Sequence, residues 1–369
     1  MKQRILINIH YLEIGGAESS LIGLLHSLNP AEYSIDLMIN DKRGELLKYV
    51  PDWVNILDIP QDYSMIERPI TEVIKKGYIR IVLARLWAKY KFRKYAKKNN
   101  PKDGSAIFSY VAKYVTPLLP DLKQSGEYDL AISYLTPHNI VLDKIKSGKK
   151  ICWIHTDYSA IDVNKDLELP VWNGYDKIVS ISDNVTHNFT VVFPELKEKI
   201  VKVEPVLSKS LIERRADEFL PQDMKREGDE ILILTIGRFS YAKNLESIPF
   251  ICKFLREKGL NVKWFIIGYG GSDQYIRDAI TENGIDDRVV ILGKKENPYP
   301  YIKACDWYVQ PSRYEGNSIT VKEAQILGKP VIITNYPTAI SQINNEEKGF
   351  IGPSDIEEFA EFVSNLLNR

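Results

Sequence analysis

The sequence predicts an α/β protein with two doubly wound parallel-sheet domains. Short apolar runs of strand length alternate with amphipathic stretches of helix length, and this alternation occurs in both halves of the 369 residues. At roughly 100 to 200 residues per domain, the length also favours two domains. Apolar residues make up 44% and charged residues 27%, which excludes a disordered, collagen-like or coiled-coil chain.

Ten strand candidates support this fold class. They are residues 4–10, 34–39, 128–134, 150–155 and 177–181 in the first half, and 231–237, 262–268, 289–292, 307–310 and 331–334 in the second. Residues 204–230 are rich in charge, hold a proline near each end and have no strand-like run, so we interpret them as the hinge region. We therefore expect domains at 1–205 and 206–369, with a last helix that either stays with the second domain or packs back on the first.

Charge and cysteine content point to a cytoplasmic protein. The 49 Lys and Arg residues balance 49 Asp and Glu residues, so the whole molecule has no long-range attraction for nucleic acid or membranes. Cys152, Cys252 and Cys305 are widely spaced and odd in number, which favours a reducing compartment over a disulfide framework. The N-terminal apolar run is too short for a signal peptide, and no stretch approaches the roughly 20 apolar residues that span a bilayer. We expect the protein to rest at most on the inner face of the membrane.

Residues 73–102 depart from the alternation. They contain eleven Lys or Arg residues and no acidic residue, with apolar and aromatic side chains interleaved. The pattern predicts an amphipathic helical insert with a basic face. Two interpretations remain open, contact with an anionic membrane surface and a solvated helix that packs its apolar side on the domain. Nucleic acid is not favoured, because no nucleic-acid motif accompanies the charge.

Two loops that follow predicted strands carry residues suited to an anion. Gly15 and Gly16 open a helix, where backbone N–H groups and the helix dipole favour negative charge. Arg238 and Lys243 follow residues 231–237, at the carboxyl end of a strand, where open α/β sheets bind ligands. A planar guanidinium and a mobile ammonium together suit a diphosphate.

A third motif lies between residues 311 and 324. Glu315 precedes a helix start, and Glu323 lies about one turn into that helix, so both carboxylates can face one cleft. Carboxylates in this position offer acceptors to a hydroxyl-rich ligand. Backbone donors of the helix start are available to a phosphate or a sugar hydroxyl.

Taken together, these motifs resemble the family 4 retaining glycosyltransferases of the GT-B fold, in the style of bacterial enzymes that build capsular, exopolysaccharide or lipopolysaccharide chains. The resemblance covers nearly the whole chain. It rests on an ordered set of motifs: Gly15-Gly16-Ala17-Glu18, Trp153-Ile154-His155, Ser180-Ile181-Ser182, Gly237-Arg238 with Lys243-Asn244, Gly268-Tyr269-Gly270, and Glu315 with Glu323.

The resemblance implies a role for each motif toward a nucleotide sugar. Arg238 and Lys243 would neutralise its diphosphate, and the pair at Gly15 and Gly16 would offer a backbone N–H to the phosphate or leave room for the acceptor. Glu323 would accept hydrogen bonds from the ribose hydroxyls. The first domain would then bind the acceptor and the second the nucleotide sugar.

Contacts to the sugar and the base are implied in the same way. Glu315 would contact the donor sugar, and His155 would touch a sugar hydroxyl and the developing positive charge. The backbone donors that assist Glu315 would be those of Asn317, Ser318 and Ile319. The base would pack near Gly293, Lys294 and Lys295. Many family members have Phe-Gly where Asn317-Ser318 stands, which leaves the sugar open.

We therefore expect a retaining glycosyltransferase that moves a sugar from a nucleotide sugar, in most relatives a UDP-sugar, to a glycan or polyprenyl-diphosphate-linked acceptor. Catalysis would depend on His155, Glu315, Arg238 and Lys243. Neither a cofactor nor a metal is expected, since no Asp-x-Asp motif stands at a strand end and two cations serve the diphosphate. Two alternatives remain, a UDP-sugar 2-epimerase of the same fold and a non-catalytic partner subunit. The oligomeric state cannot be predicted.

Overall fold

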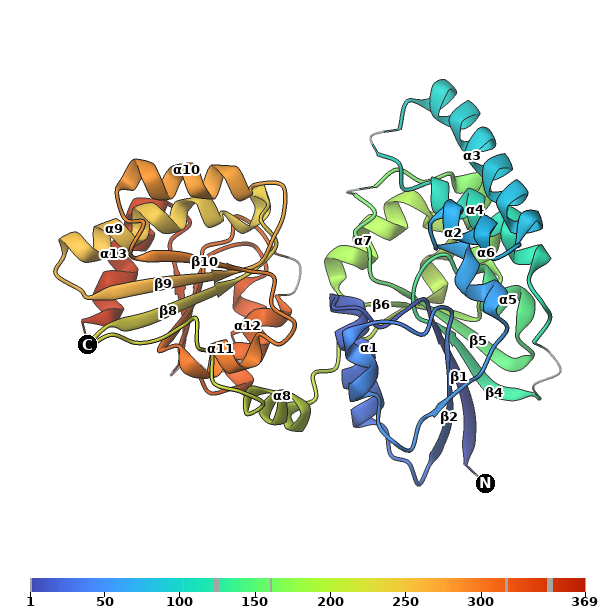
Figure 1. The fold of residues 1–369 in the computed structure, drawn as a ribbon, viewed down its shortest axis with the longest axis horizontal. Helices are drawn as coiled ribbons and strands as arrows, with labels where there is room; N and C mark the ends of the chain where they lie inside the picture. The colour runs from blue at the N-terminus through green and yellow to red at the C-terminus, as the bar shows by residue number, and fades with distance from the viewer. Residues whose placement is uncertain are drawn as a thin grey trace. The chain divides into compact units, whose positions relative to one another are not determined.

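The computed structural model describes residues 2–101, 103–122, 126–159, 161–315, 318–343 and 348–368. The chain divides into two compact units, Met1–Val206 and Leu207–Arg369 (Figure 1). This division lies one residue after the boundary that the sequence analysis places between residues 205 and 206. Each unit contains one parallel sheet, and the two are described separately. The α/β class of two doubly wound domains is thereby confirmed.

The sheet of the first unit has the strand order β3-β2-β1-β4-β5-β6-β7 among the described residues. Its strands are β1 (Gln3–Ile9), β2 (Tyr33–Ile39), β3 (Asn55–Ile56), β4 (Tyr128–Ser133), β5 (Ser147–Ile154), β6 (Lys177–Ser180) and β7 (Ile200–Lys202). The five strands predicted from apolar runs form the centre of the sheet. The strands missed by sequence reasoning, β3 and β7, are two and three residues long and lie at the edges, where little apolar surface is buried.

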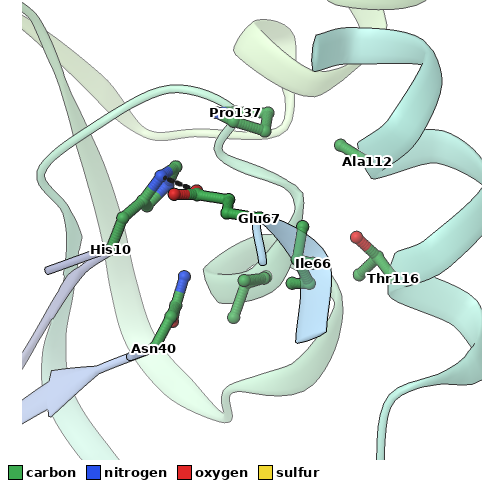
Figure 2. Close-up of a pocket in the computed structure, with 8 residues that line it drawn as sticks. His10, Asn40, Ile66, Glu67, Ala112, Thr116 and Pro137 are labelled. Atoms are coloured by element: carbon green, nitrogen blue, oxygen red, sulfur yellow. Dashed lines mark ion pairs between the residues drawn. The ribbon is translucent and has the colours of Figure 1, made fainter. Parts of the chain in front are cut away.

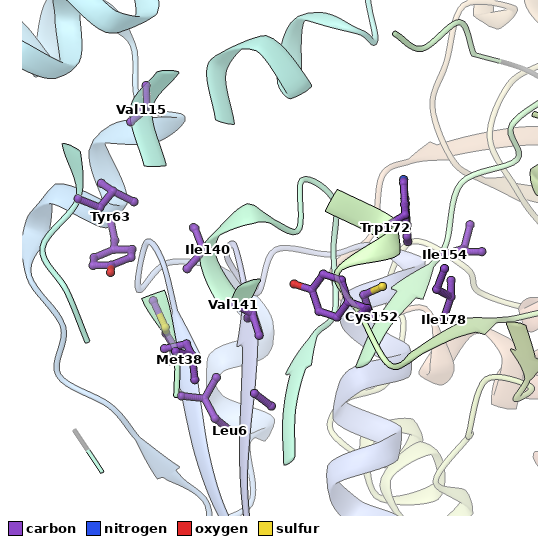
Figure 3. Packing of buried hydrophobic residues seen from close by; sticks show 14 of the residues in the cluster. Leu6, Met38, Tyr63, Val115, Ile140, Val141, Cys152, Ile154, Trp172 and Ile178 are labelled. Atoms are coloured by element: carbon purple, nitrogen blue, oxygen red, sulfur yellow. The ribbon is translucent and has the colours of Figure 1, made fainter. Parts of the chain in front are cut away.

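Helices cover this sheet, and several begin at residues that cap them. The helices are α1 (Gly16–Ser27), α2 (Ile70–Lys75), α3 (Ile79–Asn99), α4 (Ile107–Val115), α5 (Asn139–Lys144), α6 (Lys165–Asn173) and α7 (Asp183–Val192). The Asn164 and Ser182 side chains accept backbone N–H groups at the starts of α6 and α7. Apolar side chains of β5, β6 and α6, among them Cys152, Ile178 and Trp172, gather in one buried cluster (Figure 3).

The second unit has the strand order β10-β9-β8-β11-β12-β13. Its strands are β8 (Ile231–Ile236), β9 (Val262–Ile267), β10 (Val289–Gly293), β11 (Trp307–Gln310), β12 (Val331–Thr334) and β13 (Gly349–Gly352). The helices are α8 (Lys209–Ala216), α9 (Ile248–Glu257), α10 (Asp273–Asn283), α11 (Tyr299–Ala304), α12 (Ile319–Ile326) and α13 (Ile356–Leu367).

The first and last helices of this unit both pack within it. The stretch interpreted as a hinge, 204–230, contains α8, which Ser208 caps and which buries Leu211 and Ile212. It packs on α11 and α12, so most of that stretch belongs to the second unit. The last helix, α13, packs on α9 and β13 of its own unit and buries Phe359 and Val363 there.

Both sheets reverse their winding at one point. In the first unit the chain winds outward from β1 to β2 and from β4 to β5, and in the second from β8 to β9 and from β11 to β12. At such a switch point the loops after the two central strands diverge and leave a crevice at the carboxyl ends of the strands, where open α/β sheets bind ligands. The loops after β8 and β11, and those after β1 and β4, are therefore where the fold places a binding site.

Candidate functional site

The loops after β8 and β11 in the second unit are held together by Arg313. Its backbone N–H donates to the carbonyl of Ala242 at 2.8 Å, and its Nη1 donates to the carboxylate of Glu246 at 2.6 Å. The guanidinium also lies over the ring of Tyr241, 4.1 Å from the ring centroid. These contacts fix the position of one loop relative to the other.

Lys243 and Glu315 meet where the two loops are joined. The Lys243 ammonium forms an ion pair with Glu315 Oε1, and the Glu315 side chain is only 9% exposed. Ser312 Oγ donates to the same carboxylate oxygen at 2.8 Å and accepts from Gln310 Nε2 at 3.0 Å. The Tyr308 hydroxyl donates to Gln310 Oε1 at 2.8 Å. A chain of hydrogen bonds thus runs from the sheet interior to the ammonium group.

Arg238 lies on the same loop as Lys243 but has a different environment. It is exposed, and its guanidinium has no partner among the described residues. The stem of Lys243 lies over Gly237, where an added Cβ would meet Lys243 Cδ at 3.4 Å. The loop after β8 therefore presents both cations at one edge of the sheet, one held by a carboxylate and one with its donors available.

Gly268 and Gly270 allow the loop after β9 to cross the loop after β8. A Cβ on Gly268 would stand 1.9 Å from the carbonyl oxygen of Gly237, and one on Gly270 would stand 2.4 Å from that of Phe239. The Phe239 N–H donates to the Tyr269 carbonyl at 2.9 Å. No side chain fits at these two crossings, so glycine is required there.

Glu323 is buried on α12 and bonded within the unit. It accepts a hydrogen bond from the Tyr299 hydroxyl at 2.7 Å. Burial raises the pKa of Glu323 to about 7, against the smaller lowering effects of Tyr299 and of the charge of Arg215. The two predicted acidic residues thus differ in environment. Glu315 is a partner in an ion pair, whereas Glu323 is a buried carboxyl group that takes up a proton near neutral pH.

The start of α12 is only partly available as a donor. The Ser318 N–H donates to Gln342 Oε1 at 3.1 Å, a contact that no sequence pattern predicts because the two residues are 24 positions apart. Ile319, the first residue of the helix, is half-buried. Asn317 lies outside the described residues.

The expected base-binding residues follow β10. Gly293 has a positive φ of 70°, and its carbonyl accepts the Gly268 N–H at 3.0 Å. Lys294 lies over the exposed ring of Tyr269, with 5.6 Å from the ammonium nitrogen to the ring centroid. The Lys295 ammonium forms an ion pair with Asp223 Oδ2 at 2.6 Å, so its charge is already balanced within the unit.

In the first unit, the glycine pair at the start of α1 faces a carboxylate of its own chain. A Cβ on Gly15 would stand 2.2 Å from Glu18 Oε2, because the Glu18 side chain folds back over the first turn. Burial raises the pKa of Glu18. An incoming phosphate at the N–H of Gly16 would therefore have to displace this carboxylate.

His155 follows β5 and lies beside Tyr134, with 4.8 Å between the ring centroids. Burial lowers the pKa of His155 to about 4, so the imidazole is neutral at physiological pH. Its Nε2 is buried and has no partner among the described residues. A neutral ring in this setting can exchange a hydrogen bond with a hydroxyl group.

A recess at the switch point of the first sheet was not predicted as a site. Figure 2 shows His10 paired with Glu67 at its edge, with the Asn40 amide nitrogen directed toward the pair. Burial would raise the pKa of Glu67, but the hydrogen bond and charge of His10 outweigh this effect and lower it. Glu67 lies 57 residues from His10 in the chain, so no local spacing in the sequence marks the pair.

Two further features bear on the class of site. Within the described parts of the chain, no group of three or more His, Cys, Asp or Glu side chains is arranged to hold a metal ion. Among the same residues, none of the helices combines the length and the apolar character that crossing a bilayer requires.

Comparison with known proteins finds glycosyltransferases, mainly through the second unit. Residues 216–369 match the family model described as Glycosyl transferases group 1. The capsular polysaccharide biosynthesis glycosyltransferase CapM of Staphylococcus aureus is 30% identical over 151 residues, which are 38% of this chain and 37% of CapM. An uncharacterized glycosyltransferase of Methanocaldococcus jannaschii is 24% identical over 253 residues, which are 63% of this chain and 60% of that protein. The matched regions therefore cover less than two thirds of these relatives.

A solved structure extends the likeness to the whole fold. TarM of S. aureus, crystallised with UDP among its ligands, superposes with a TM-score of 0.63 at 12% identity, over 100% of this chain and 93% of TarM. Two Rossmann-like units with this likeness define a protein of the GT-B class. The second unit of the chain matches the group 1 glycosyl transferases, and the relatives are glycosyltransferases as well, which supports the family predicted from the sequence.

Proposed function

We propose that the protein is a retaining glycosyltransferase that moves a sugar from a UDP-sugar to a glycan or polyprenyl-diphosphate-linked acceptor in cell-surface polysaccharide synthesis. The observation that carries this proposal is the pairing of Lys243 with Glu315, beside the available guanidinium of Arg238, at the switch point of the second sheet. CapM, named for capsular polysaccharide synthesis, and TarM, solved with UDP, support the acceptor class and the nucleotide.

The two cations suit the charge that develops in the reaction. Breaking a glycosyl phosphate bond builds negative charge on the leaving diphosphate and positive charge on the sugar ring. Arg238 and Lys243 stabilise the first of these charges preferentially in the transition state. The hydrogen-bond chain behind Glu315 holds the ammonium in place before substrate arrives, so little reorganisation is needed.

The carboxylates and the imidazole have separate tasks in this proposal. When the diphosphate binds, the Lys243 ammonium pairs with it and leaves Glu315. The Glu315 carboxylate then accepts a hydrogen bond from a hydroxyl of the donor sugar. Glu323, whose pKa is near neutrality, accepts hydrogen bonds from the ribose hydroxyls. The neutral His155 exchanges a hydrogen bond with a sugar hydroxyl, and the leaving phosphate takes the proton of the acceptor.

The acceptor is assigned to the first unit. There the recess beside His10 and Glu67 is lined by an imidazole, a carboxylate and the amide of Asn40, but it has room for only about one water molecule and is too small for a sugar ring. It therefore does not by itself define the acceptor site. A lipid-linked acceptor would also bring the enzyme to the cytoplasmic face of the membrane as a peripheral protein.

The test is turnover of a panel of nucleotide sugars by the purified protein, with thermal stabilisation as a second readout. We expect a UDP-sugar to stabilise the protein and to be consumed when a glycan or lipid-linked acceptor is added. An α-linked product from an α-linked donor, identified by NMR, would support retention, whereas inversion would contradict it. Full loss of turnover in EDTA would contradict metal independence.

The two alternatives give different results in the same assay. A UDP-sugar 2-epimerase would change the sugar in the absence of any acceptor. A non-catalytic partner subunit would show no turnover, and polymer synthesis in cells would survive the variants Arg238→Ala and Glu315→Ala.

A further inference from the structure

The helix α3 presents an apolar stripe to solvent. Its large apolar side chains recur at a spacing that places them on one helix face, and they are 48% to 61% exposed. These side chains are Ile79, Leu83, Leu86, Trp87 and Tyr90. The rings of Trp87 and Tyr90 are stacked, with 5.4 Å between their centroids. Monomeric proteins rarely leave such a contiguous patch exposed unless it has a partner.

The stripe is not the side on which the helix packs. The opposite face buries Ile81 and Ala88, and it places Phe92 and Tyr95 against Tyr110 of α4 with ring centroids 6.1 and 6.0 Å apart. Figure 1 shows α3 at the periphery of the first unit, with its carboxyl-terminal end beyond the neighbouring helices. The helix thus packs one apolar side on the domain, as one of the two interpretations expects, but these five side chains are not part of that side.

Cations flank the stripe on both sides and extend past its end. Six exposed ones have no carboxylate partner among the described residues: Arg80, Lys89, Arg93, Lys94, Lys97 and Lys98. The Lys91 ammonium nitrogen lies over the Trp87 ring, 4.8 Å from its centroid. Residues 73–102 contain no acidic side chain at all, so nothing in this stretch opposes an anionic surface.

We infer that this face of α3 docks in the plane of an anionic lipid bilayer, with the apolar stripe between the headgroups and the flanking cations on lipid phosphates. A basic helix with exposed Trp, Tyr and Leu on one face has the composition of helices that lie in the membrane interface. A second protein would need a matching acidic and apolar groove, whereas a bilayer offers both chemistries over the whole length of the helix. This docking does not depend on the proposed transfer reaction.

The experiment measures cosedimentation of the full-length protein with large vesicles of phosphatidylglycerol and phosphatidylcholine, compared with vesicles of phosphatidylcholine alone. A cation variant carries glutamine at Lys89, Arg93, Lys94 and Lys97, and a stripe variant carries Leu83→Gln with Tyr90→Gln. Two matched controls change equally exposed residues elsewhere. They are glutamine at Lys2, Lys149, Lys197 and Lys225, and the pair Leu220→Gln with Tyr275→Gln.

We expect the wild type to bind the anionic vesicles and not the zwitterionic ones. The cation variant should lose at least about 100-fold in partition coefficient, and the stripe variant about tenfold, while both controls bind as wild type. All variants should keep the thermal stability of the wild type, because every substituted side chain is exposed.

Three results would overturn the inference. One is failure of the wild type to bind anionic vesicles, and another is equal loss in the controls. The third is a dimer in sedimentation velocity that only the stripe variant dissolves. Consumption of a UDP-sugar in detergent solution, measured on the same variants, reports on the transfer reaction separately.

Discussion

The joined loops of the second unit and the helix α3 of the first unit are both rich in cations, yet they use them differently. In the loops, Lys243 is paired with Glu315 and Arg313 with Glu246, so these two cations are fixed, while Arg238 on the same loop as Lys243 keeps its donors available. On α3 the cations stand beside exposed apolar side chains and have no carboxylate partner among the described residues. Fixed donors suit a small anion in one position, whereas mobile cations suit a fluid and diffuse surface.

The largest expected effect separates a substrate-binding cation from a surface one. Arg238→Ala should lower kcat/KM with the UDP-sugar about 100- to 1000-fold, because a donor aimed at the leaving diphosphate is lost. Its stability should not change, since the side chain is exposed. The matched control is Arg214→Ala, another exposed arginine of the same unit, which should keep full activity in the same kinetic assay.

The next effect tests whether the loops are as fixed as their contacts imply. Gly268→Ala should cost about 3 kcal/mol or more of unfolding free energy, because its Cβ would stand 1.9 Å from the Gly237 carbonyl oxygen. Gly271→Ala, where a Cβ would meet nothing within 4 Å, should cost little. Urea unfolding measures both, and equal effects would mean that the crossing of the loops is not rigid.

A pH-dependent effect should arise from Glu323. Its pKa is raised from 4.5 to about 7, so the native state binds the proton more tightly than the unfolded chain does. The stabilising contribution is complete below pH 4.5 and is lost as the pH rises through 7. Relative to Glu323→Gln, the wild type should therefore lose up to about 3 kcal/mol of unfolding free energy between pH 4.5 and pH 8. A constant difference between the two proteins over this range would refute the buried setting of this carboxyl.

The smallest expected effect separates stability from catalysis at the ion pair. Lys243→Met should destabilise the protein by about 2 kcal/mol, because Glu315 would keep a buried charge with Ser312 as its remaining donor among the described residues. The double variant Lys243→Met with Glu315→Gln should regain most of this loss, as measured by thermal unfolding. Lys243→Met should be inactive in sugar transfer, and the double variant should not recover this activity. Recovery of activity in the double variant would assign the pair a structural role.

The architecture could be predicted from the sequence because its strands are buried. Apolar runs such as Ile231–Ile236 and Val262–Ile267 indicate strands that are buried in the centre of a parallel sheet. The edge strands β3, β7 and β13 were missed, since short and partly exposed segments carry no such pattern. The helix α8 was missed because its charged face resembles a linker.

The residues of the candidate site could be predicted from the sequence, but the contacts between them could not. The motif spacing identified Arg238, Lys243, Glu315 and Glu323 but not how they are paired. The Lys243–Glu315 pair joins residues 72 positions apart, and the pairing of His10 with Glu67 depends on the order of β1 and β2 in the sheet. Such contacts join segments that are far apart in the chain, and no local pattern in the sequence records them.

The most direct test of the central claim is titration calorimetry of UDP and GDP with the wild type, Arg238→Ala and Arg214→Ala. We expect the wild type to bind UDP, Arg238→Ala to weaken this binding at least about tenfold, or about 1.4 kcal/mol, and Arg214→Ala to leave it unchanged. Equal affinity of all three proteins for UDP would contradict the claim that this loop binds the diphosphate.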